Sequence, residues 1–184
     1  MARTRDAAAT RDAILRSALV AFTRHGYDGV GVREIAGAAG VTAMLVNRYF
    51  GSKEQLFAEV VEAAFAQRTL IADDVETMSR FAASALVAAE PRSVDGFLLM
   101  LRSVANPRAN EILRSAIEVH FQRPLEALLP GAQPQERAAL FLSVLAGVRL
   151  MQQVLGSPAL ATADPAALER RLRSLFELLV EPPS

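Results

Sequence analysis

The chain has 184 residues, of which 52% are hydrophobic and 22% charged, and it contains no cysteine. This length and composition favour one or two folded domains with a buried core, while the lack of cysteine excludes disulfides and thiolate metal sites and fits the cytoplasm. The formal net charge of zero does not by itself favour a nucleic-acid partner, and the longest apolar run, residues 138–148, is shorter than the roughly 20 residues of a membrane-spanning helix.

The whole chain is predicted to be all-α, with about nine helices. Apolar residues recur at spacings of three and four, and no segment alternates apolar and polar residues as a half-buried strand does. The first helix is expected over residues 9–24, with Ile14 and Phe22 on its apolar face, and Gly26 is placed to end it in the left-handed conformation. Charged residues such as Arg16 lie inside this segment, so we do not expect a signal peptide.

A helix-turn-helix is predicted directly after the first helix. Two short helices, over residues 33–39 and 42–49, are separated by Gly40, which can take the positive φ of the turn. Thr42 can cap the second of these helices. In a helix-turn-helix the second helix presents its N-terminal half to base edges in the major groove of DNA.

The rest of the chain is predicted to form longer helices whose ends are marked by capping residues. Ser52 begins an S-x-x-Q capping box, and Asn106 and Asp164 each precede a proline at the first helical position. Pro124 is expected to kink or break the helix around it. The expected helices cover residues 52–71, 75–89, 94–105, 107–128, 135–155 and 165–180.

The flanks of the helix-turn-helix carry a resemblance to a known family. Gly26 and Tyr27 follow the first helix, and residues 49–54 read YFGSKE. With these residues, the segment over 9–65 resembles the DNA-binding domain of the TetR family of bacterial repressors. The resemblance implies an N-terminal three-helix DNA-binding domain over residues 1–51 and a larger helical domain for effector binding and dimerisation over residues 52–184.

The resemblance also implies which side chains face DNA. Asn47 and Arg48 suit adenine and guanine edges, and Lys53 lies in the first turn of a helix, where the backbone amides already favour an anion. Residues 1–53 hold eight Lys and Arg against four Asp and Glu, a net charge of +4, which leaves −4 on the remainder. The implied groove-facing residues are Thr42, Ala43, Met44, Asn47 and Arg48, and the implied phosphate-binding residues are Tyr49 and Lys53.

Three positions depart from the family pattern. Gly31 stands where a small hydroxyl residue is usual, Ala43 where a basic residue is common, and Asn47 where an aromatic residue is common. We therefore expect weaker phosphate contacts than the family pattern provides, and an operator sequence that differs from those of typical family members. The alternative interpretation is a set of core helices in a bundle, with Arg48 and Lys53 on a solvated face.

The helices over residues 135–155 and 165–180 are predicted to form the interface between the two chains of a homodimer. The first is apolar on two faces, so one face can meet the core and the other a partner subunit. The resemblance implies that the last two helices of each subunit form a four-helix interface, and the alternative is a two-sided core helix in a monomer. The predicted interface residues are Phe141, Leu145, Val148, Leu155, Leu168, Leu172, Leu175, Phe176 and Leu179.

A ligand cavity is predicted among the middle helices, where apolar side chains are frequent. Methionine and phenylalanine at helical spacing are also typical of plain core, and a lone histidine is commonly hydrogen-bonded packing. Both interpretations stay open for these residues. The predicted lining residues are Phe81, Phe97, Met100, Leu101, Ile117, His120, Phe121 and Met151.

These features predict a ligand-responsive repressor that binds a palindromic double-stranded DNA operator as a homodimer. An unknown small apolar effector would bind the C-terminal domain and release the DNA. The alternative is a helical interaction protein that responds to a protein partner or to nothing. We expect no enzymatic activity and no metal site, because there is no cysteine and the two histidines, His25 and His120, lie far apart in sequence. We also expect no cofactor, and no membrane association because the longest apolar run is too short to span a membrane.

Overall fold

The computed structural model describes residues 2–66, 74–88 and 96–181 and divides the chain into two compact units. Unit 1 comprises Met1–Arg68 and Arg92–Ala116, and unit 2 comprises Thr69–Pro91 and Ile117–Ser184. The described part of the chain contains no β-strand, which confirms the all-α prediction. The predicted boundary between a DNA-binding and an effector-binding domain after residue 51 stays a prediction, because the two units are defined by packing and not by function.

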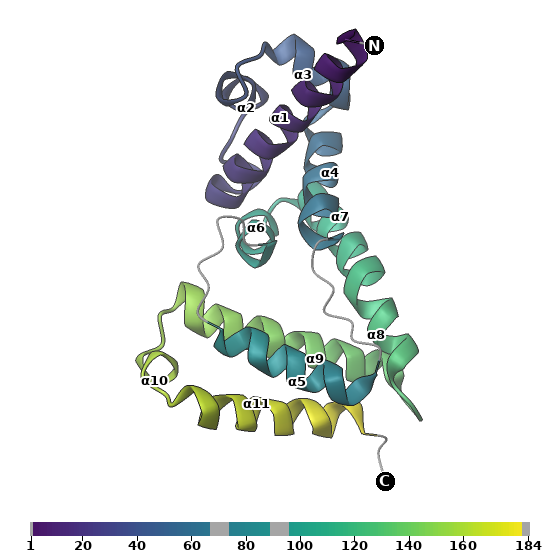
Figure 1. The fold of residues 1–184 in the computed structure, drawn as a ribbon, viewed down its shortest axis with the longest axis vertical. Helices are drawn as coiled ribbons and strands as arrows, with labels where there is room; N and C mark the ends of the chain where they lie inside the picture. The colour runs from purple at the N-terminus through teal and green to yellow at the C-terminus, as the bar shows by residue number, and fades with distance from the viewer. Residues whose placement is uncertain (1, 67–73, 89–95, 182–184) are drawn as a thin grey trace. The chain divides into compact units, whose positions relative to one another are not determined.

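Unit 1 contains the N-terminal helices and two helices from the middle of the chain (Figure 1). Helix α1 packs against α2, α4 and α6, and α3 packs against α2 and α4. The core is built from the apolar faces of these helices, with Ile14 and Phe22 fully buried on α1 as predicted. The helices are α1 (Ala2–His25), α2 (Val32–Ala38), α3 (Ala43–Phe50), α4 (Lys53–Ala66), α6 (Gly96–Ser103) and α7 (Pro107–Ile117).

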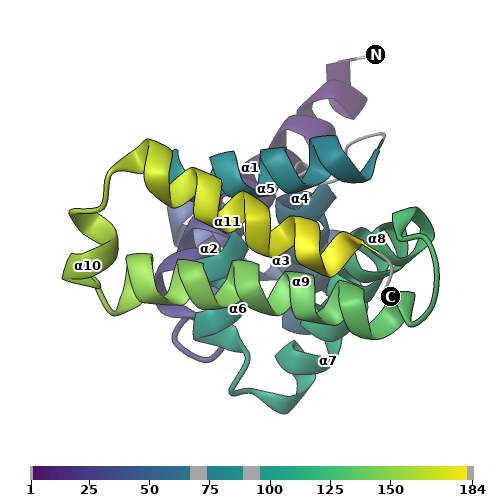
Figure 2. The same ribbon diagram turned by 90° about the horizontal axis from the view of Figure 1, so that it is seen from below.

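In unit 2, three helices run side by side in both ribbon views (Figures 1 and 2). Helix α11 (Pro165–Val180) packs against α5 (Val75–Val87) and α9 (Pro134–Arg149), and its Phe176 ring lies 4.4 Å from that of Phe141 between ring centroids. Both rings belong to the apolar core of the unit, where burying one such side chain contributes about 1.5–3 kcal/mol. The remaining helices are α8 (Arg123–Leu128) and α10 (Pro158–Ala161).

Most predicted helix ends agree with the structure. Asn106 and Asp164 cap α7 and α11, since their side chains accept hydrogen bonds from the Ala109 and Ala167 amides. The predicted helix over 52–71 is described as far as residue 66, and its last five residues lie outside the described part. Short α10 was not expected.

Two π-helical segments also went unpredicted, η1 (Glu118–Gln122) and η2 (Leu150–Val154). Pro124 lies in the first turn of α8, directly after η1, so the α-helical pattern is interrupted where the sequence predicts a kink or break. Within residues 2–66, 74–88 and 96–181, no helix is long and apolar enough to cross a membrane.

Candidate nucleic-acid interface

The turn between α2 and α3 is held by backbone geometry and small residues. Gly40 adopts a φ of +70°, in the left-handed region that favours glycine. The Val41 amide donates a hydrogen bond of 2.9 Å to the carbonyl of Ala36, which is itself buried. Thr42 caps α3, because its hydroxyl accepts a hydrogen bond from the Leu45 amide at 3.3 Å. The predicted helix-turn-helix is therefore formed.

Helix α3 has one buried face and one exposed face. Val46 and Phe50 are buried and point into unit 1, while Met44, Asn47 and Arg48 are exposed. At 100° per residue, Met44 and Arg48 lie opposite the buried pair, one helical turn apart. This is the geometry of a helix that rests on its domain and offers its outer face to a partner. Of the other predicted contacts, Thr42 is exposed, and Ala43 and Tyr49 are half-buried.

The start of α4 provides a fixed positive charge beside α3. Ser52 accepts a hydrogen bond from the Gln55 amide at 3.2 Å, as its predicted capping role requires. Lys53 Nζ lies 4.5 Å from the centroid of the Tyr27 ring, in cation–π contact. Lys53 is the first residue of α4, so its side chain belongs to a helical turn whose backbone amides favour an anion such as a phosphate group.

Glu54, the next residue, is held in its ionised form. Hydrogen bonds from its own backbone amide, from Arg108 and from Ser52 lower its pKa from 4.5 to about 2. The Arg108 Nη1 to Glu54 Oε1 distance is 2.8 Å. The pKa of Tyr27 is raised, first because the ring is buried and then because the Glu54 carboxylate lies beside its hydroxyl.

Tyr27 is positioned by an aromatic cluster and by a distant backbone contact. Its ring packs against Phe22 and Phe57, with centroids 6.1 and 5.0 Å away. Its amide donates a hydrogen bond of 3.0 Å to the hydroxyl of Ser103, 76 residues further along the chain. The surface that holds Lys53 therefore depends on α6 as well as on the N-terminal helices.

The sequence did not predict the contacts that the end of α6 and the start of α7, here called the α6–α7 corner, make with the end of α1 and the segment after it. Arg102 donates a hydrogen bond to the Thr23 carbonyl at 2.6 Å, and Asn106 donates one to Asp28 at 2.9 Å. Gly26 has a φ of +72°, as predicted, and a Cβ there would lie 2.2 Å from the Arg102 carbonyl oxygen. Only the conformation of Gly26 has a local signal, since nothing in the sequence pairs residues so far apart.

The basic residues of this region differ in how they are held. Arg11 forms an ion pair with Glu59, and its guanidinium lies 4.9 Å from the centroid of the Phe50 ring. Arg33 and Arg48 are exposed. Gly31 is the N-cap of α2 with no side-chain cap, and its φ of −100° is one that any residue adopts. The expected loss of a hydroxyl at this position therefore leaves open space rather than a distorted backbone.

The residues predicted to line a ligand cavity occur in both units. Phe97, Met100 and Leu101 lie on α6 and are half-buried. In unit 2, Phe81 on α5 and Met151 on η2 are exposed, at 50% and 41%. The three remaining residues, which are half-buried at the end of α7 and on η1, are Ile117, His120 and Phe121. The cavity stays a prediction.

The predicted dimer residues mostly pack inside unit 2. Phe141, Leu172 and Phe176 are buried in its core, so they leave almost no surface for a partner. The half-buried residues packed against that core are Leu145, Val148, Leu168 and Leu179. Leu155 and Leu175 are exposed, at 63% and 50%. Residues of both apolar faces of α9, such as Phe141 and Val144, pack against the core of this unit, and the predicted dimer interface stays a prediction.

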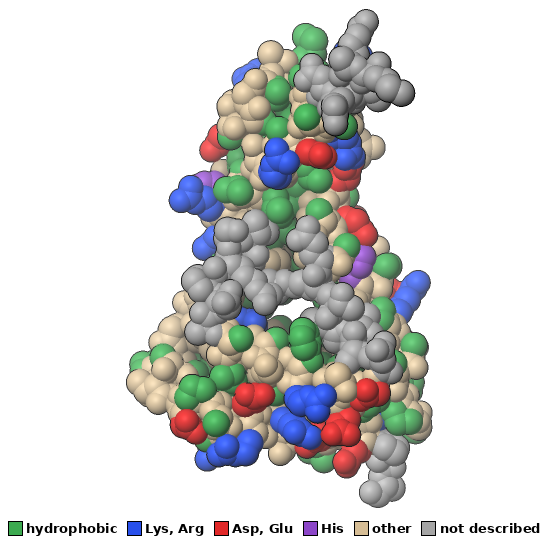
Figure 3. Space-filling view, in the orientation of Figure 1, with side chains coloured by type: hydrophobic (Ala, Val, Ile, Leu, Met, Phe, Trp, Pro, Cys, Tyr) green, Lys and Arg blue, Asp and Glu red, His purple; other side chains and the backbone are tan. Residues whose placement is uncertain are grey.

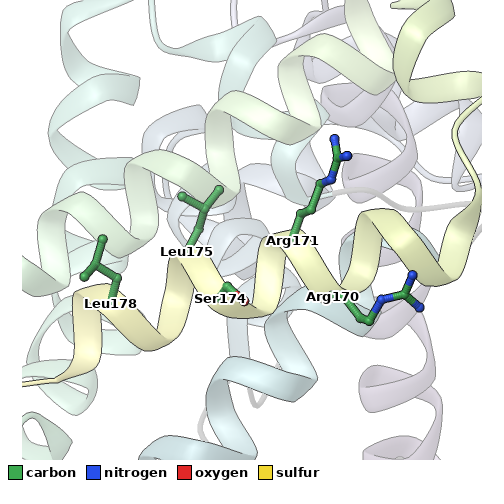
Figure 4. Close-up of a pocket in the computed structure, with 5 residues that line it drawn as sticks. All are labelled: Arg170, Arg171, Ser174, Leu175 and Leu178. Atoms are coloured by element: carbon green, nitrogen blue, oxygen red, sulfur yellow. The ribbon is translucent and has the colours of Figure 1, made fainter.

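Other apolar side chains of α9 and α11 point outward. Leu140 and Leu178 are 53% and 72% exposed, on α9 and α11 respectively. Leu175 and Leu178 line an open hollow of about 590 Å³ together with Arg170, Arg171 and Ser174. Figure 4 shows these side chains on α11. On the face shown in Figure 3, acidic and basic side chains intermingle over α5 and α11.

Comparison with known proteins gives a consistent result. The family model described as "Bacterial regulatory proteins, tetR family" matches residues 14–60, and "Tetracyclin repressor-like, C-terminal domain" matches residues 76–179. The HTH-type transcriptional repressor NicS of Pseudomonas putida is 38% identical over 64 residues, 35% of this chain and 30% of that protein. The regulatory protein RaaS of Mycobacterium tuberculosis is 58% identical over 43 residues, 23% of this chain and 20% of that protein. The chain thus spans less than a third of either relative.

Solved structures match over nearly the whole chain. A TetR-family transcriptional regulator from Rhodococcus sp. superposes with a TM-score of 0.71 at 15% identity, over 95% of this chain and 100% of the other. NalD of Pseudomonas aeruginosa, the secondary repressor of the MexAB-OprM multidrug efflux pump, gives a TM-score of 0.68 at 20% identity, over 95% of this chain and 98% of the other. At these identities the likeness shows the fold.

Proposed function

The chain belongs to the TetR family of bacterial regulatory proteins, and on that premise we propose that it is a transcriptional repressor that binds a palindromic DNA operator as a homodimer. The observation that carries the proposal is the exposed face of α3. Met44, Asn47 and Arg48 project from a helix whose opposite side is buried, and the next helix, α4, begins with Lys53, which contacts the Tyr27 ring. An α-helix fits the major groove, where Asn and Arg side chains can pair with adenine and guanine edges.

In this proposal, phosphate contacts position α3 before bases are read. Lys53 and the first amides of α4 bind one phosphate, with Tyr49 alongside. The cation–π contact with Tyr27 reduces the freedom of the Lys53 side chain. Because less side-chain entropy is lost on binding, a charge held in this way binds an anion better than one on a free lysine.

We assign the dimer contact to the outward faces of α9 and α11. Leu140, Leu175 and Leu178 are large apolar side chains exposed on these two helices. A second copy of the chain, related by two-fold symmetry, would bring the same surface against them and remove them from water. Arg170 and Arg171 lie beside the two leucines of α11 and would form the polar rim.

A small apolar effector is the third part of the proposal. The predicted lining residues of unit 2 include His120 and Phe121 on η1 and Met151 on η2. π-Helical turns widen a helix locally and are frequent at functional sites. A thermal-shift screen with apolar compounds tests this part, because a ligand that binds only the folded state raises the melting temperature. An absence of any stabilising compound across a broad panel would favour a regulator without a small-molecule effector.

Selection of bound sequences from random duplex DNA tests the proposal as a whole. We expect enrichment of an inverted repeat by the intact protein and loss of that enrichment in Arg48→Ala. Leu178→Glu should convert the dimer to a monomer in sedimentation experiments and weaken binding, while Val104→Glu, which changes an exposed apolar residue at the α6–α7 corner, should not. A selection that enriches no sequence would contradict the proposal.

A further inference from the structure

Met44 is an unusual side chain for the outer face of α3. It is 82% exposed, more than any other large hydrophobic residue in the described part of the chain. Its neighbours on that face, Asn47 and Arg48, are polar. The exposure does not come from a frayed end, because the hydroxyl of Thr42 caps the same turn. Met44 is thus presented on an ordered helix, in the centre of the face that the proposed function places against DNA.

The chemistry of the major groove narrows what an apolar side chain can contact there. Base edges in this groove offer hydrogen-bond donors and acceptors, with one apolar feature, the C5-methyl group of thymine. A thioether cannot donate a hydrogen bond and is only a weak acceptor, so it gains little from the polar edges. Its flexible, unbranched chain suits contact with a methyl group.

We propose that Met44 reads a thymine through its C5-methyl group and so sets one position of the operator half-site. This inference rests on the proposed function, since it names the base that α3 selects. Met44 and Arg48 are one helical turn apart, a rise of about 5–6 Å, whereas stacked base pairs are about 3.4 Å apart. The thymine therefore lies within about two base pairs of the guanine that Arg48 contacts.

Removing the methyl group from DNA tests the contact without changing any hydrogen bond. Deoxyuridine pairs as thymine does but lacks the C5-methyl, so it is substituted for each thymine of the selected operator in turn. We expect one thymine position in each half-site to respond. Substitution at this position in one half-site should lower the affinity of the intact protein about fourfold, and substitution in both half-sites should lower it about 15-fold.

Matched protein variants show whether Met44 makes this contact. Met44→Ala should bind the thymine and deoxyuridine operators equally well, because the side chain that senses the methyl group is gone. Met44→Leu should keep most of the discrimination. Val20→Ala, which changes another exposed apolar residue of unit 1, should discriminate as the intact protein does.

Two results would overturn the inference while leaving the proposed function intact. One is an intact protein that binds every deoxyuridine operator as tightly as the thymine operator. The other is a position-specific loss that persists unchanged in Met44→Ala. A failure of the intact protein to select any DNA sequence would overturn the proposed function and this inference together, so the two failures are distinguishable.

Discussion

The two units use charged and apolar residues in opposite ways. In unit 1, an aromatic ring supports a charge at the surface, with Lys53 over Tyr27. In unit 2, Arg137 is 8% exposed and donates four hydrogen bonds to backbone carbonyl oxygens, while Leu175 and Leu178 face outward on α11.

This difference separates two kinds of partner. A surface that holds cations in place suits a polyanion, because the charge is already positioned and binding releases counterions. A surface of exposed leucines bordered by arginines suits another apolar surface with a polar rim, such as a second copy of the same unit. A net charge of zero for the whole chain conceals this division.

The largest expected effect, on the stability of the protein, comes from replacing the buried arginine of unit 2, Arg137. Arg137 bonds to the carbonyls of Pro130, Leu179 and Val180, and so ties the start of α9 to the end of α11. Arg137→Met would leave these carbonyls unpaired, and we expect it to lower the free energy of unfolding by about 3 kcal/mol. Urea unfolding at a fixed protein concentration measures this, with exposed Arg114→Met as the control. A loss below about 1 kcal/mol would show that these contacts are not structural.

The next effect tests the support beneath Lys53. Ser103 is 1% exposed and accepts the hydrogen bond from the Tyr27 amide. Ser103→Ala leaves a buried amide unpaired, so we expect a loss of about 1–2 kcal/mol in stability and a several-fold loss in operator affinity. Ser84→Ala, on the exposed face of α5, is the matched control. Unchanged affinity in a destabilised Ser103→Ala protein would separate stability from the positioning of Lys53.

A pH titration tests the carboxylate at the start of α4. The pKa of Glu54 is lowered from 4.5 to about 2, so its stabilising contribution is fully present above pH 4.5 and is lost as the pH falls towards 2. The difference in unfolding midpoint between the intact protein and Glu54→Gln should therefore shrink over this range. Arg108→Met should raise the pKa of Glu54, which NMR can follow directly. An unchanged pKa in that variant would rule out the Arg108 contact as a cause of the shift.

The smallest effect restores a missing cap in unit 1. Gly31 precedes α2 with a φ of −100° and open space around a Cβ. Gly31→Ser should stabilise the protein by a few tenths of a kcal/mol and strengthen DNA binding, because its hydroxyl can cap α2 and contact a phosphate. Gly31→Ala supplies the Cβ without the hydroxyl and should not strengthen binding. Equal affinities for the two variants would exclude the phosphate contact.

Features that depend on neighbouring residues could be predicted from the sequence. The caps by Thr42, Asn106 and Asp164 and the positive φ of Gly26 and Gly40 are short-range effects of side-chain and backbone chemistry, and the structure has all of them. The helix-turn-helix followed from the same signals. The helix-turn-helix makes up most of the candidate DNA interface.

Features that depend on distant residues could not be predicted. The partners of Ser103 and Arg108 lie more than 50 residues away, so no local pattern announces them. The two apolar faces of α9 were visible, but choosing the core face requires knowing where α11 packs, and Phe141 belongs to the core. The π-helical segments have no pattern distinct from an α-helix at the level of composition.

The most direct test of the account measures binding of the intact protein to its selected duplex as salt and protein concentration are varied. If a dimer contacts about six to eight phosphates, the logarithm of the affinity should fall against the logarithm of the salt concentration with a slope of about −5 to −7. The complex should contain two chains per duplex. An affinity that does not respond to salt, or a complex with a single chain, would contradict a dimeric repressor that reads DNA through α3.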